Sequence, residues 1–315
     1  MTPSPTDAVA GRACPLHYRY AATALWVPAE AECDVLYVVG GLYGNEQALD
    51  AVVELFGQER GRTRLVFNGD FHGFDVDPQV FRRIDERVMA FSATRGNVET
   101  ELAGDDTGAG CGCGYPDWVA GETVARSNRI LERLRGACPS PAVRRRLAAL
   151  PMWRRIDVGG RRVAVVHGDA DSLAGWNFAH ELRCEPGHRQ RVAPWFDIAE
   201  VDIFASSHTC EAVLARFGST TGGGPGVVVN NGAAGMPSAS DTRHGLVTRI
   251  ATTPFEGPQR RHGVVVDGVH VDALAIDDTT TASPPAFWPT GQPAAMPMRR
   301  TGGASSRDRL RRRMH

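Results

Sequence analysis

The sequence predicts an α/β protein, and three observations support this prediction. Short runs of β-branched and other apolar residues recur along the chain, each followed by turn residues or histidine. Segments with the hydrophobic spacing of a helix lie between these runs. After residue 203 the strand-like runs follow one another closely, which favours a second, more antiparallel sheet. Strands that alternate with helices in this way are typical of α/β sheet proteins.

Each expected strand is short, apolar and bounded by turn residues, as buried strands are. The runs cover residues 35–39, 65–67, 88–91, 163–166, 203–205 and 227–229. Residues 261–275 are expected to close the fold as a hairpin, because Asp267 and Gly268 form a pair that favours a tight turn between strands.

The expected helices follow from apolar periodicity and from capping residues. Residues 46–56 carry apolar side chains at the spacing of one helix face. Residues 123–134 and 141–150 show helical patterns as well. Ser140 is placed to cap the last of these helices, and Pro141 suits its first turn.

The chain of 315 residues is expected to hold one large folded unit with an extension at each end. Residues 1–33 mix Pro, Ala and polar side chains, so we expect an N-terminal extension laid over the core. Residues 34–277 carry the strand and helix signals of the domain. Residues 278–315 are rich in Thr, Pro, Ala and then Arg, which predicts a disordered tail.

Composition excludes several classes of function. The formal charge is −1, from 35 basic and 36 acidic residues, so we expect no nucleic-acid partner. We also expect no membrane attachment, because no apolar run approaches the roughly 20 residues that span a bilayer. All of the basic residues are arginine, which excludes Schiff-base chemistry and a phosphate-binding loop built on lysine.

Seven scattered cysteines and the absence of a visible secretory signal predict a cytoplasmic protein with reduced thiols. A cysteine-phosphatase mechanism is rejected at both Cys-x5-Arg spacings. Two of the three residues after Cys138 are prolines, which have no backbone N–H, and the residues after Cys210 are expected to form a strand. Neither segment can therefore surround a phosphate with backbone N–H groups.

Polar residues follow four of the expected strands, at the point where each strand ends. These residues are Asp70, Asn97, His167 and His208. Because ligand-binding groups in open α/β sheets collect at the carboxyl ends of strands, we expect the four side chains to converge on one crevice. One carboxylate, one amide oxygen and two imidazoles suit a divalent transition metal such as Mn, Fe, Co, Ni or Zn.

The ordered set of motifs resembles the calcineurin-like metallophosphoesterases, especially their small bacterial phosphodiesterase branch. The resemblance covers roughly residues 35 to 275 and rests on motifs that each follow a strand: Gly44-Asn45-Glu46, Gly69-Asp70, Gly96-Asn97, His167-Gly168, His208-Thr209-Cys210 and Asn230 to Pro237. It implies a sandwich of two facing mixed β-sheets flanked by helices. It also implies that Asp70, Asn97, His167 and His208 hold a metal ion that activates water for hydrolysis of a phosphate ester.

The departures from the family pattern fall in one of its two metal pockets. The resemblance implies that the ligands of the second pocket are intact, whereas Gly41, Tyr43 and Cys210 replace the private ligands of the first. Val98 stands where many relatives carry a general-acid histidine. A one-sided change of this kind favours a rebuilt site over a decayed one, and it leaves open whether one or two ions bind.

Several residues are candidates for the altered pocket and for the substrate. Cys210 is expected to contact a second ion, with Tyr43, His72 and Asp75 as further candidate ligands. The loop at Cys111 and Cys113 is interpreted either as a cover for the crevice or as a flexible surface loop. We expect Arg95 to bind phosphate, with Asn45 as a second contact.

The function that the sequence favours is metal-dependent hydrolysis of a small phosphate ester, either a monoester or a diester. The alternative is a weak or inactive binding protein that lost one metal pocket. The sequence identifies neither the substrate nor the oligomeric state.

Overall fold

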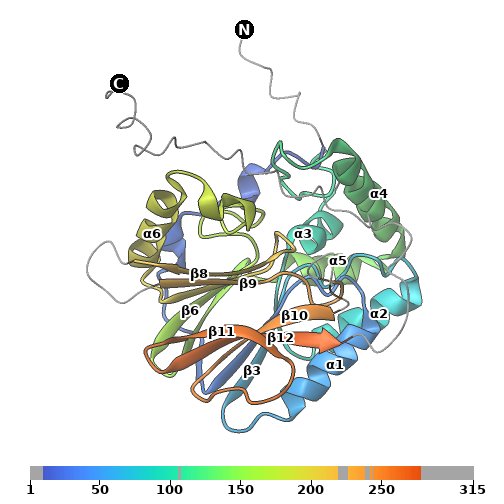
Figure 1. Ribbon diagram of the computed structural model, residues 1–315. Helices are drawn as coiled ribbons and strands as arrows, with labels where there is room; N and C mark the ends of the chain where they lie inside the picture. Colours follow the sequence, from blue (N-terminus) through green and yellow to red (C-terminus); the bar gives the residue numbers. More distant parts are fainter. Residues whose placement is uncertain (1–9, 106–107, 219–225, 238–241, 243, 278–315) are drawn as a thin grey trace, which may run out of the picture.

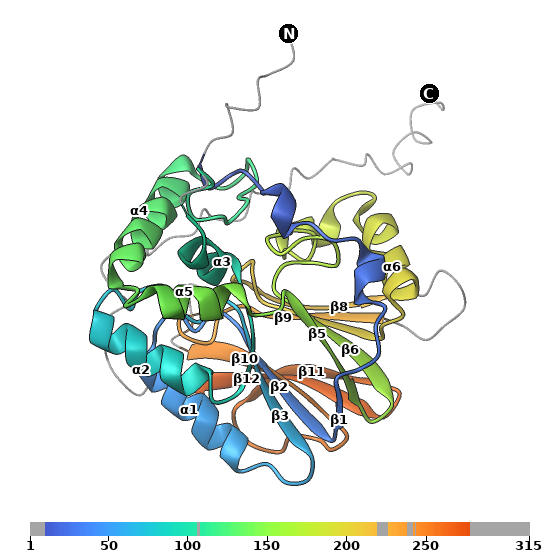
Figure 2. The same cartoon turned by 180° about the vertical axis from the view of Figure 1, so that it is seen from behind.

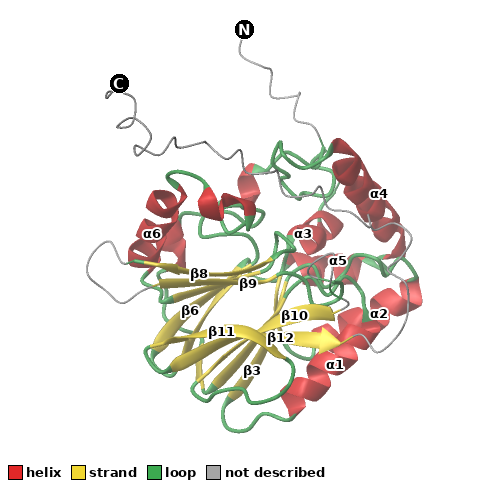
Figure 3. Cartoon of the chain, in the orientation of Figure 1, coloured by secondary structure: helices red, strands yellow, loops and turns green. Residues whose placement is uncertain are grey.

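Two six-stranded β-sheets face each other in the computed structural model, with helices on their outer faces (Figures 1 and 3). The structure describes residues 10–105, 108–218, 226–237, 242 and 244–277. The tail predicted at residues 278–315 lies outside this range. None of the helices in the described range is long and apolar enough to cross a membrane.

Sheet I has the strand order β1-β5-β6-β7-β9-β8. Its strands are Ala31–Cys33 (β1), Trp153–Val158 (β5), Arg161–Val166 (β6), Ile203–Ser206 (β7), Ala212–Phe217 (β8) and Gly226–Asn231 (β9). The central strands β6, β7 and β9 are parallel to one another, with Ala164 opposite Phe204 and Phe204 opposite Val228. Parallel strands place the loops that follow β6 and β7 at the same edge of the sheet.

Sheet II has the strand order β11-β12-β10-β2-β3-β4. Its strands are Val35–Val39 (β2), Thr63–Asn68 (β3), Ser92–Thr94 (β4), His244–Ala251 (β10), Arg260–Val266 (β11) and Val269–Asp277 (β12). Strands β2, β3 and β4 are parallel, so the loops after β3 and β4 also lie at one edge. Strands β11 and β12 form the expected hairpin around Asp267 and Gly268.

The helices cover the outer faces of both sheets. They are Glu46–Gly57 (α1), Pro78–Val88 (α2), Asn97–Ala103 (α3), Gly121–Ala137 (α4), Pro141–Ala148 (α5) and His188–Ala199 (α6), with short 3-10 turns at Leu16–Tyr18, Ala22–Leu25 and Glu181–Cys184. Buried residues of α1 to α5 share one core with the outer face of sheet II, and α6 packs on sheet I. Ser140 caps α5 by accepting a hydrogen bond from Val143 N, as expected.

The space between the sheets is filled by aliphatic side chains from both. Leu36, Val38 and Val66 of sheet II pack in one cluster with Val165 and Ile203 of sheet I. These side chains are almost completely buried. Interdigitated aliphatic residues fix the two sheets relative to each other, and this places the loops at their carboxyl edges close together.

Residues 22–33 pack along sheet I, beside α6 (Figure 2), whereas Gly11 and Arg12 hydrogen-bond to the segment of residues 109–119. Tyr18 and Leu25 are fully buried, and β1 pairs with β5 in parallel. Arg155 Nη1 donates a hydrogen bond to Leu25 O, which anchors the segment to the sheet. This part of the expected N-terminal extension therefore contributes core side chains and an edge strand.

Two expectations from the sequence were wrong in detail. The run at residues 88–91 is not a strand: α2 extends to Val88, and the strand begins at Ser92. Val88 belongs to the buried helix face of Phe81 and Ile84, which lie seven and four residues before it. The strands after residue 203 also do not form a separate sheet, because β7, β8 and β9 join sheet I whereas β10, β11 and β12 join sheet II.

Candidate metal centre

The four predicted ligands lie together where the two sheets present their strand ends. Asp70 follows β3, Asn97 begins α3 after β4, and His167 and His208 follow β6 and β7. His167 Nε2 lies 3.1 Å from Asn97 Oδ1 and 3.2 Å from His208 Nδ1. The same nitrogen is 3.4 Å from Asp70 Oδ2. All four side chains are at most 5% exposed.

Glycine at position 96 permits this close approach. A Cβ atom on Gly96 would lie 2.3 Å from Asp70 Oδ1 and 2.9 Å from His167 Cε1. Any larger residue would push the carboxylate and the imidazole apart. The Gly-Asn dipeptide therefore supplies both a ligand and the space for its neighbours.

The buried carboxylate of Glu99 holds the loop of Asp70 in place. Glu99 Oε2 accepts hydrogen bonds from Asp70 N at 2.8 Å and from Gly96 N at 2.9 Å. Val98 N donates to Asp70 Oδ1 at 3.1 Å. Because Oδ1 is engaged in this way, Oδ2 of Asp70 is the oxygen that faces His167.

Backbone carbonyls fix the orientation of the other three ligands. His167 Nδ1 lies 2.8 Å from Asn68 O, and His208 Nε2 lies 2.9 Å from Cys113 O. A carbonyl oxygen only accepts, so each ring donates through that nitrogen and keeps a lone pair on the other one. Asn97 Nδ2 donates to Cys111 O at 2.9 Å, which turns the amide oxygen toward His167.

This donor set fits a divalent cation. Each side chain is held so that an unprotonated nitrogen or an oxygen points at a common centre. Asp70, His167 and His208 offer ligand atoms that all lie within 4.8 Å of one another. Acceptors crowded together without a donor repel one another, whereas a cation satisfies all of them, and ligands oriented by a second layer of hydrogen bonds are typical of metal sites.

The protonation state of His208 agrees with that interpretation, whereas His167 holds a proton more readily than a free imidazole, and a metal ion would have to displace that proton. Burial lowers the pKa of His167, but the Asp70 carboxylate outweighs burial and raises it above the usual value. Burial also works to raise the pKa of Asp70, yet His167 holds it below the usual value. Burial and the neighbouring His167 lower the pKa of His208 to about 3. His208 is therefore neutral at pH 7, as a metal ligand must be.

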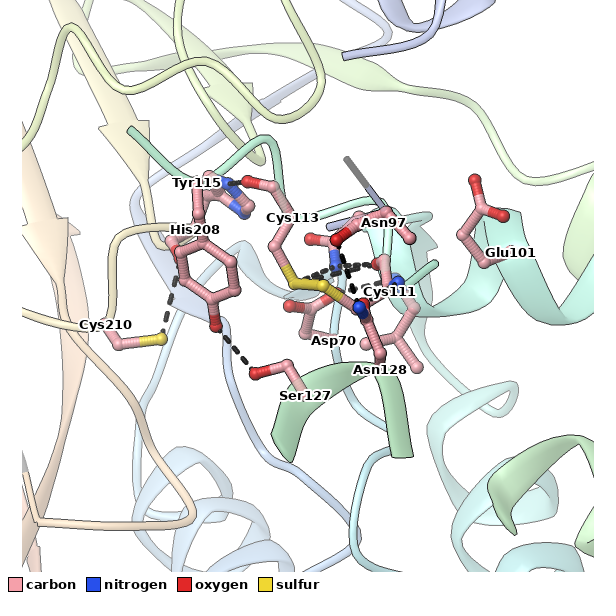
Figure 4. The surroundings of a disulfide bond; sticks show 12 residues. Asp70, Asn97, Glu101, Cys111, Cys113, Tyr115, Ser127, Asn128, His208 and Cys210 are labelled. Atoms are coloured by element: carbon pink, nitrogen blue, oxygen red, sulfur yellow. Dashed lines mark hydrogen bonds between the residues drawn. A yellow bond between two sulfur atoms is a disulfide. The ribbon is translucent and has the colours of Figure 1, made fainter. Parts of the chain in front are cut away.

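The Cys111–Cys113 loop covers the site and carries a disulfide (Figure 4). The expectation of reduced thiols was therefore wrong for these two cysteines. Their Cα atoms lie 5.3 Å apart, within the range that a disulfide bridges. Cys111 N donates to Asn128 Oδ1 of α4, so the loop is also tied to a helix. The interpretation as a cover describes this loop better than that of a flexible surface loop.

The altered first pocket contains a hydrogen-bonded pair of neutral side chains. Tyr43 Oη lies 2.9 Å from Cys210 Sγ. Burial raises the pKa of Cys210 to about 12 and that of Tyr43 well above its usual value, so both groups keep their protons at pH 7. Tyr43 and Cys210 line the same cavity as Asp70 and His208.

His72 and Asp75 do not reach the pocket that the sequence suggested for them. His72 Nδ1 lies 2.6 Å from Asp75 Oδ2, and the His72 ring stacks on Phe81 at a centroid distance of 3.6 Å. Asp75 Oδ1 accepts a hydrogen bond from Gly73 N. Both side chains point into the packing of α2, away from the cavity.

The expected phosphate contacts are also placed elsewhere. Arg95 Nη1 donates to Ala148 O at the end of α5, and partial burial lowers the pKa of Arg95. Asn45 caps α1 by accepting from Ala48 N, and its Nδ2 donates to Gly235 O. Neither side chain lines the cavity described below, and their contact with a phosphate remains a prediction from the sequence.

No family model and no curated protein matches this sequence. Among solved structures, a hypothetical protein from Pyrococcus horikoshii OT3 is 16% identical over 77% of this chain and 88% of that chain, with a TM-score of 0.51. A metallophosphoesterase from Sphaerobacter thermophilus is 17% identical over the same shares, with a TM-score of 0.48. At these identities, likeness concerns the fold alone.

The paired six-stranded sheets, their flanking helices and this likeness agree with the architecture implied by the motifs. The chain has the calcineurin-like metallophosphoesterase fold. The metal-binding roles of Asp70, Asn97, His167 and His208 remain predictions, which their geometry supports.

Within this metallophosphoesterase fold, a cavity of about 400 Å³ opens beside the four side chains. Asp70, Asn97 and His208 form part of its lining, together with Tyr43 and Cys210. Most of the remaining lining comes from α4 and from the segment before it. A substrate in this cavity would contact the candidate ligands directly.

The sequence did not reveal the groups that orient the ligands. Glu99 was visible only as the residue after Val98, although its spacing from Gly96 is that of a helix capping contact. The carbonyls of Cys111 and Cys113 carried no signal, because backbone acceptors are common to every residue. Only the folded Cys111–Cys113 loop shows that these two carbonyls face Asn97 and His208.

Proposed function

We propose that this protein hydrolyses a small phosphate ester with a divalent transition metal held by Asp70, Asn97, His167 and His208. The observation that supports this proposal best is the convergence of four buried, pre-oriented donors on one cavity. Mn, Fe, Co, Ni and Zn all suit this mixture of oxygen and nitrogen ligands. A bound ion would polarise the phosphoryl oxygen and lower the pKa of a water molecule.

The residues of the chain contribute positioning and electrostatics. Asp70 supplies the negative charge of the ligand set, and Glu99 holds its backbone so that one carboxylate oxygen faces the site. Neutral His208 and the amide oxygen of Asn97 add ligands without further charge. Trp176, whose ring lies 5.4 Å from that of His208, forms part of the cavity wall beside the site.

The geometry supports one well-formed ion site. The Tyr43–Cys210 pair offers no charged ligand at neutral pH, because both groups are protonated. A second ion would have to displace a thiol proton, as a metal beside a cysteine does. We therefore expect a tightly held ion at Asp70 and a weaker position beside Cys210.

Metal analysis of the purified protein, followed by a turnover assay, tests this proposal. Protein stripped with EDTA would be reloaded with each candidate metal and assayed on p-nitrophenyl phosphate and bis(p-nitrophenyl) phosphate. We expect about one tightly bound ion per chain and turnover that EDTA abolishes. Turnover that persists after the metal is removed would overturn the proposal.

A second function, metal binding with weak or no catalysis, is favoured by the Tyr43–Cys210 contact. Two metal ions together stabilise both the attacking and the leaving oxygen. The resemblance implies that the neutral Tyr43–Cys210 pair stands where ligands of one of the two ions would be. Protein that carries its metal but turns over neither ester would support this alternative.

The remaining expectations concern the surroundings of the reaction. A small phosphate ester as the partner and a cytoplasmic location stay predictions from the sequence. The Cys111–Cys113 disulfide is at odds with the cytoplasmic prediction, because disulfides are rare in that reducing compartment.

A further inference from the structure

The cavity beside the candidate ligands has a wall that none of the roles above explains. One face of α4 presents Ile130, Leu131 and Leu134 to it, at the spacing of a single helix stripe. Tyr115 and Trp118 line it from the segment before α4. A volume of about 400 Å³ is within the range of small-molecule binding sites.

The aromatic part of this wall is held in place by hydrogen bonds. Tyr115 Oη lies 2.9 Å from Ser127 Oγ, which links the segment before α4 to the helix itself. Trp176 Nε1 donates to Cys113 O at 3.0 Å. The ring of Trp176 lies 5.6 Å from that of Tyr115 and 6.3 Å from that of Trp118. These contacts give a preformed aromatic surface, and Figure 4 shows Tyr115 beside His208 and the disulfide.

The aromatic surface is continuous with the candidate metal centre. Cys113 O accepts hydrogen bonds from both Trp176 Nε1 and His208 Nε2. Trp118 is 46% exposed, so it lies near the open side of the cavity, whereas Leu131 and Leu134 are buried. A group that enters past Trp118 would therefore reach the ligands along apolar walls.

We propose that this cavity binds an aromatic group of the phosphate ester while the phosphate lies at the cation that Asp70 and His208 would help to hold. The inference rests on the proposed hydrolysis and names its substrate class, an aryl phosphate ester. An aromatic ring packs edge-to-face or offset against Tyr115, Trp118 and Trp176. A polyhydroxylated group would instead bury hydroxyls against apolar walls that offer them few partners.

Arg126 supplies a polar contact in this cavity. Its Nη2 is paired with Glu122, but its buried Nη1 has no hydrogen-bond partner among the described residues. Because Arg126 also lines the cavity, an aromatic group that carries a hydrogen-bond acceptor would satisfy this donor.

The experiment compares 1-naphthyl phosphate with phenyl phosphate, whose leaving groups are chemically similar but differ in size. If only diesters are hydrolysed, the methyl diesters of the two replace them. We expect the metal-loaded wild-type protein to show a KM for the naphthyl ester at least tenfold below that for the phenyl ester. Calorimetric titration of EDTA-treated protein with 1-naphthol, which needs neither metal nor turnover, measures the cavity alone.

Two variants and a matched control assign the effect to the cavity. Ile130→Trp fills it from α4, and Trp118→Ala removes part of its aromatic wall. Both are expected to weaken 1-naphthol binding at least fivefold and to reduce the preference for the naphthyl ester. Arg129→Trp places the same large residue on the exposed side of α4 and is expected to leave binding and turnover unchanged.

The outcomes separate this inference from the proposed hydrolysis. Equal KM values for the two esters in an active enzyme, or no 1-naphthol binding, would overturn the inference and leave the hydrolysis intact. Binding of 1-naphthol with no turnover of either ester would refute the hydrolysis and the assignment of a substrate, while supporting an aromatic-ligand cavity. Weakened binding in both cavity variants but not in Arg129→Trp, with the naphthyl ester preferred, supports the whole inference.

Discussion

Replacing Asp70 with asparagine is the sharpest perturbation of the candidate metal centre. The amide side chain of Asp70→Asn would keep an oxygen for the hydrogen bond from Val98 N, but it would turn an NH2 group toward the other ligands in place of the carboxylate oxygen. The substitution therefore removes one ligand and its charge with little change of shape. It tests the role of Asp70 without creating a cavity.

The expected magnitudes follow from the ligand set. About 12 kcal/mol of binding free energy, typical of a structural zinc site, divided over four ligands gives about 3 kcal/mol for each. That value corresponds to a loss of about two orders of magnitude in affinity. The metal-free variant is expected to unfold within about 1 kcal/mol of the wild type, because loss of the pairing with His167 is offset by relief of repulsion with Glu99.

Asp75→Asn is the matched control, since Asp75 is an equally buried carboxylate on the same loop. Its oxygens bond to His72 and Gly73 and do not face the cavity. This variant is expected to keep full metal affinity but to lose about 1–3 kcal/mol of unfolding free energy. Competition with a fluorescent chelator gives the affinities, and calorimetric unfolding with EDTA gives the stabilities. Full affinity in Asp70→Asn, or an equal loss in Asp75→Asn, would place the ion elsewhere.

Three further predictions follow from the site and its surroundings. A thiol-reactive reagent should find five thiols in the unfolded, unreduced protein and seven after reduction. Replacing Cys111 and Cys113 with serine should weaken metal binding about 10- to 100-fold, because the disulfide holds the loop whose carbonyls orient Asn97 and His208. Below the raised pKa of His167 a proton competes with the metal for Nε2, so metal affinity should fall about tenfold per pH unit there, as measured by chelator competition. Protonation of His208 should not affect metal affinity above about pH 4. Gly41→Asp should lower the free energy of unfolding by about 2–4 kcal/mol and Gly160→Asp by about 1 kcal/mol in thermal unfolding, because both glycines have positive φ but only Gly41 is crowded by Ala233. Equal losses in the two variants would show that crowding is unimportant.

Much of the site could be predicted because its ligands follow strands. The runs at β3, β6 and β7 are apolar and end at a turn, and a parallel sheet brings such ends to one edge whatever the rest of the fold does. Asp70, His167 and His208 were therefore placed from local pattern alone, and the structure brings them together. Helix α1 was equally visible, since its apolar spacing and its cap at Asn45 are local features.

Other features depend on contacts distant in sequence, which a local pattern does not contain. Strand β10 pairs with β2, more than 200 residues earlier, so its sheet could not be read from its own residues. Asn45 followed the family motif and resembled a phosphate contact, yet its side chain is committed to the helix cap and to Gly235. Arg95 has a similar position after a strand, but its guanidinium is directed to the carbonyl of Ala148 at the end of α5.

The altered first pocket is best understood as one packed unit. Gly41, Tyr43 and Cys210 are the three positions that depart from the ligands of the family pattern, and all three have positive φ. A Cβ atom on Gly41 would lie 2.9 Å from the Tyr43 ring and 3.0 Å from Ala233 Cβ, so glycine here makes room for the tyrosine. The Tyr43 hydroxyl in turn meets the Cys210 thiol. Random loss of ligands would leave gaps or unpaired polar groups, whereas these three residues fit one another and keep neutral groups beside Asp70. A neutral, hydrogen-bonded pair beside Asp70 fits the proposal of one tightly held ion, with the aromatic wall on the other side of the cavity and at most a weaker position beside Cys210.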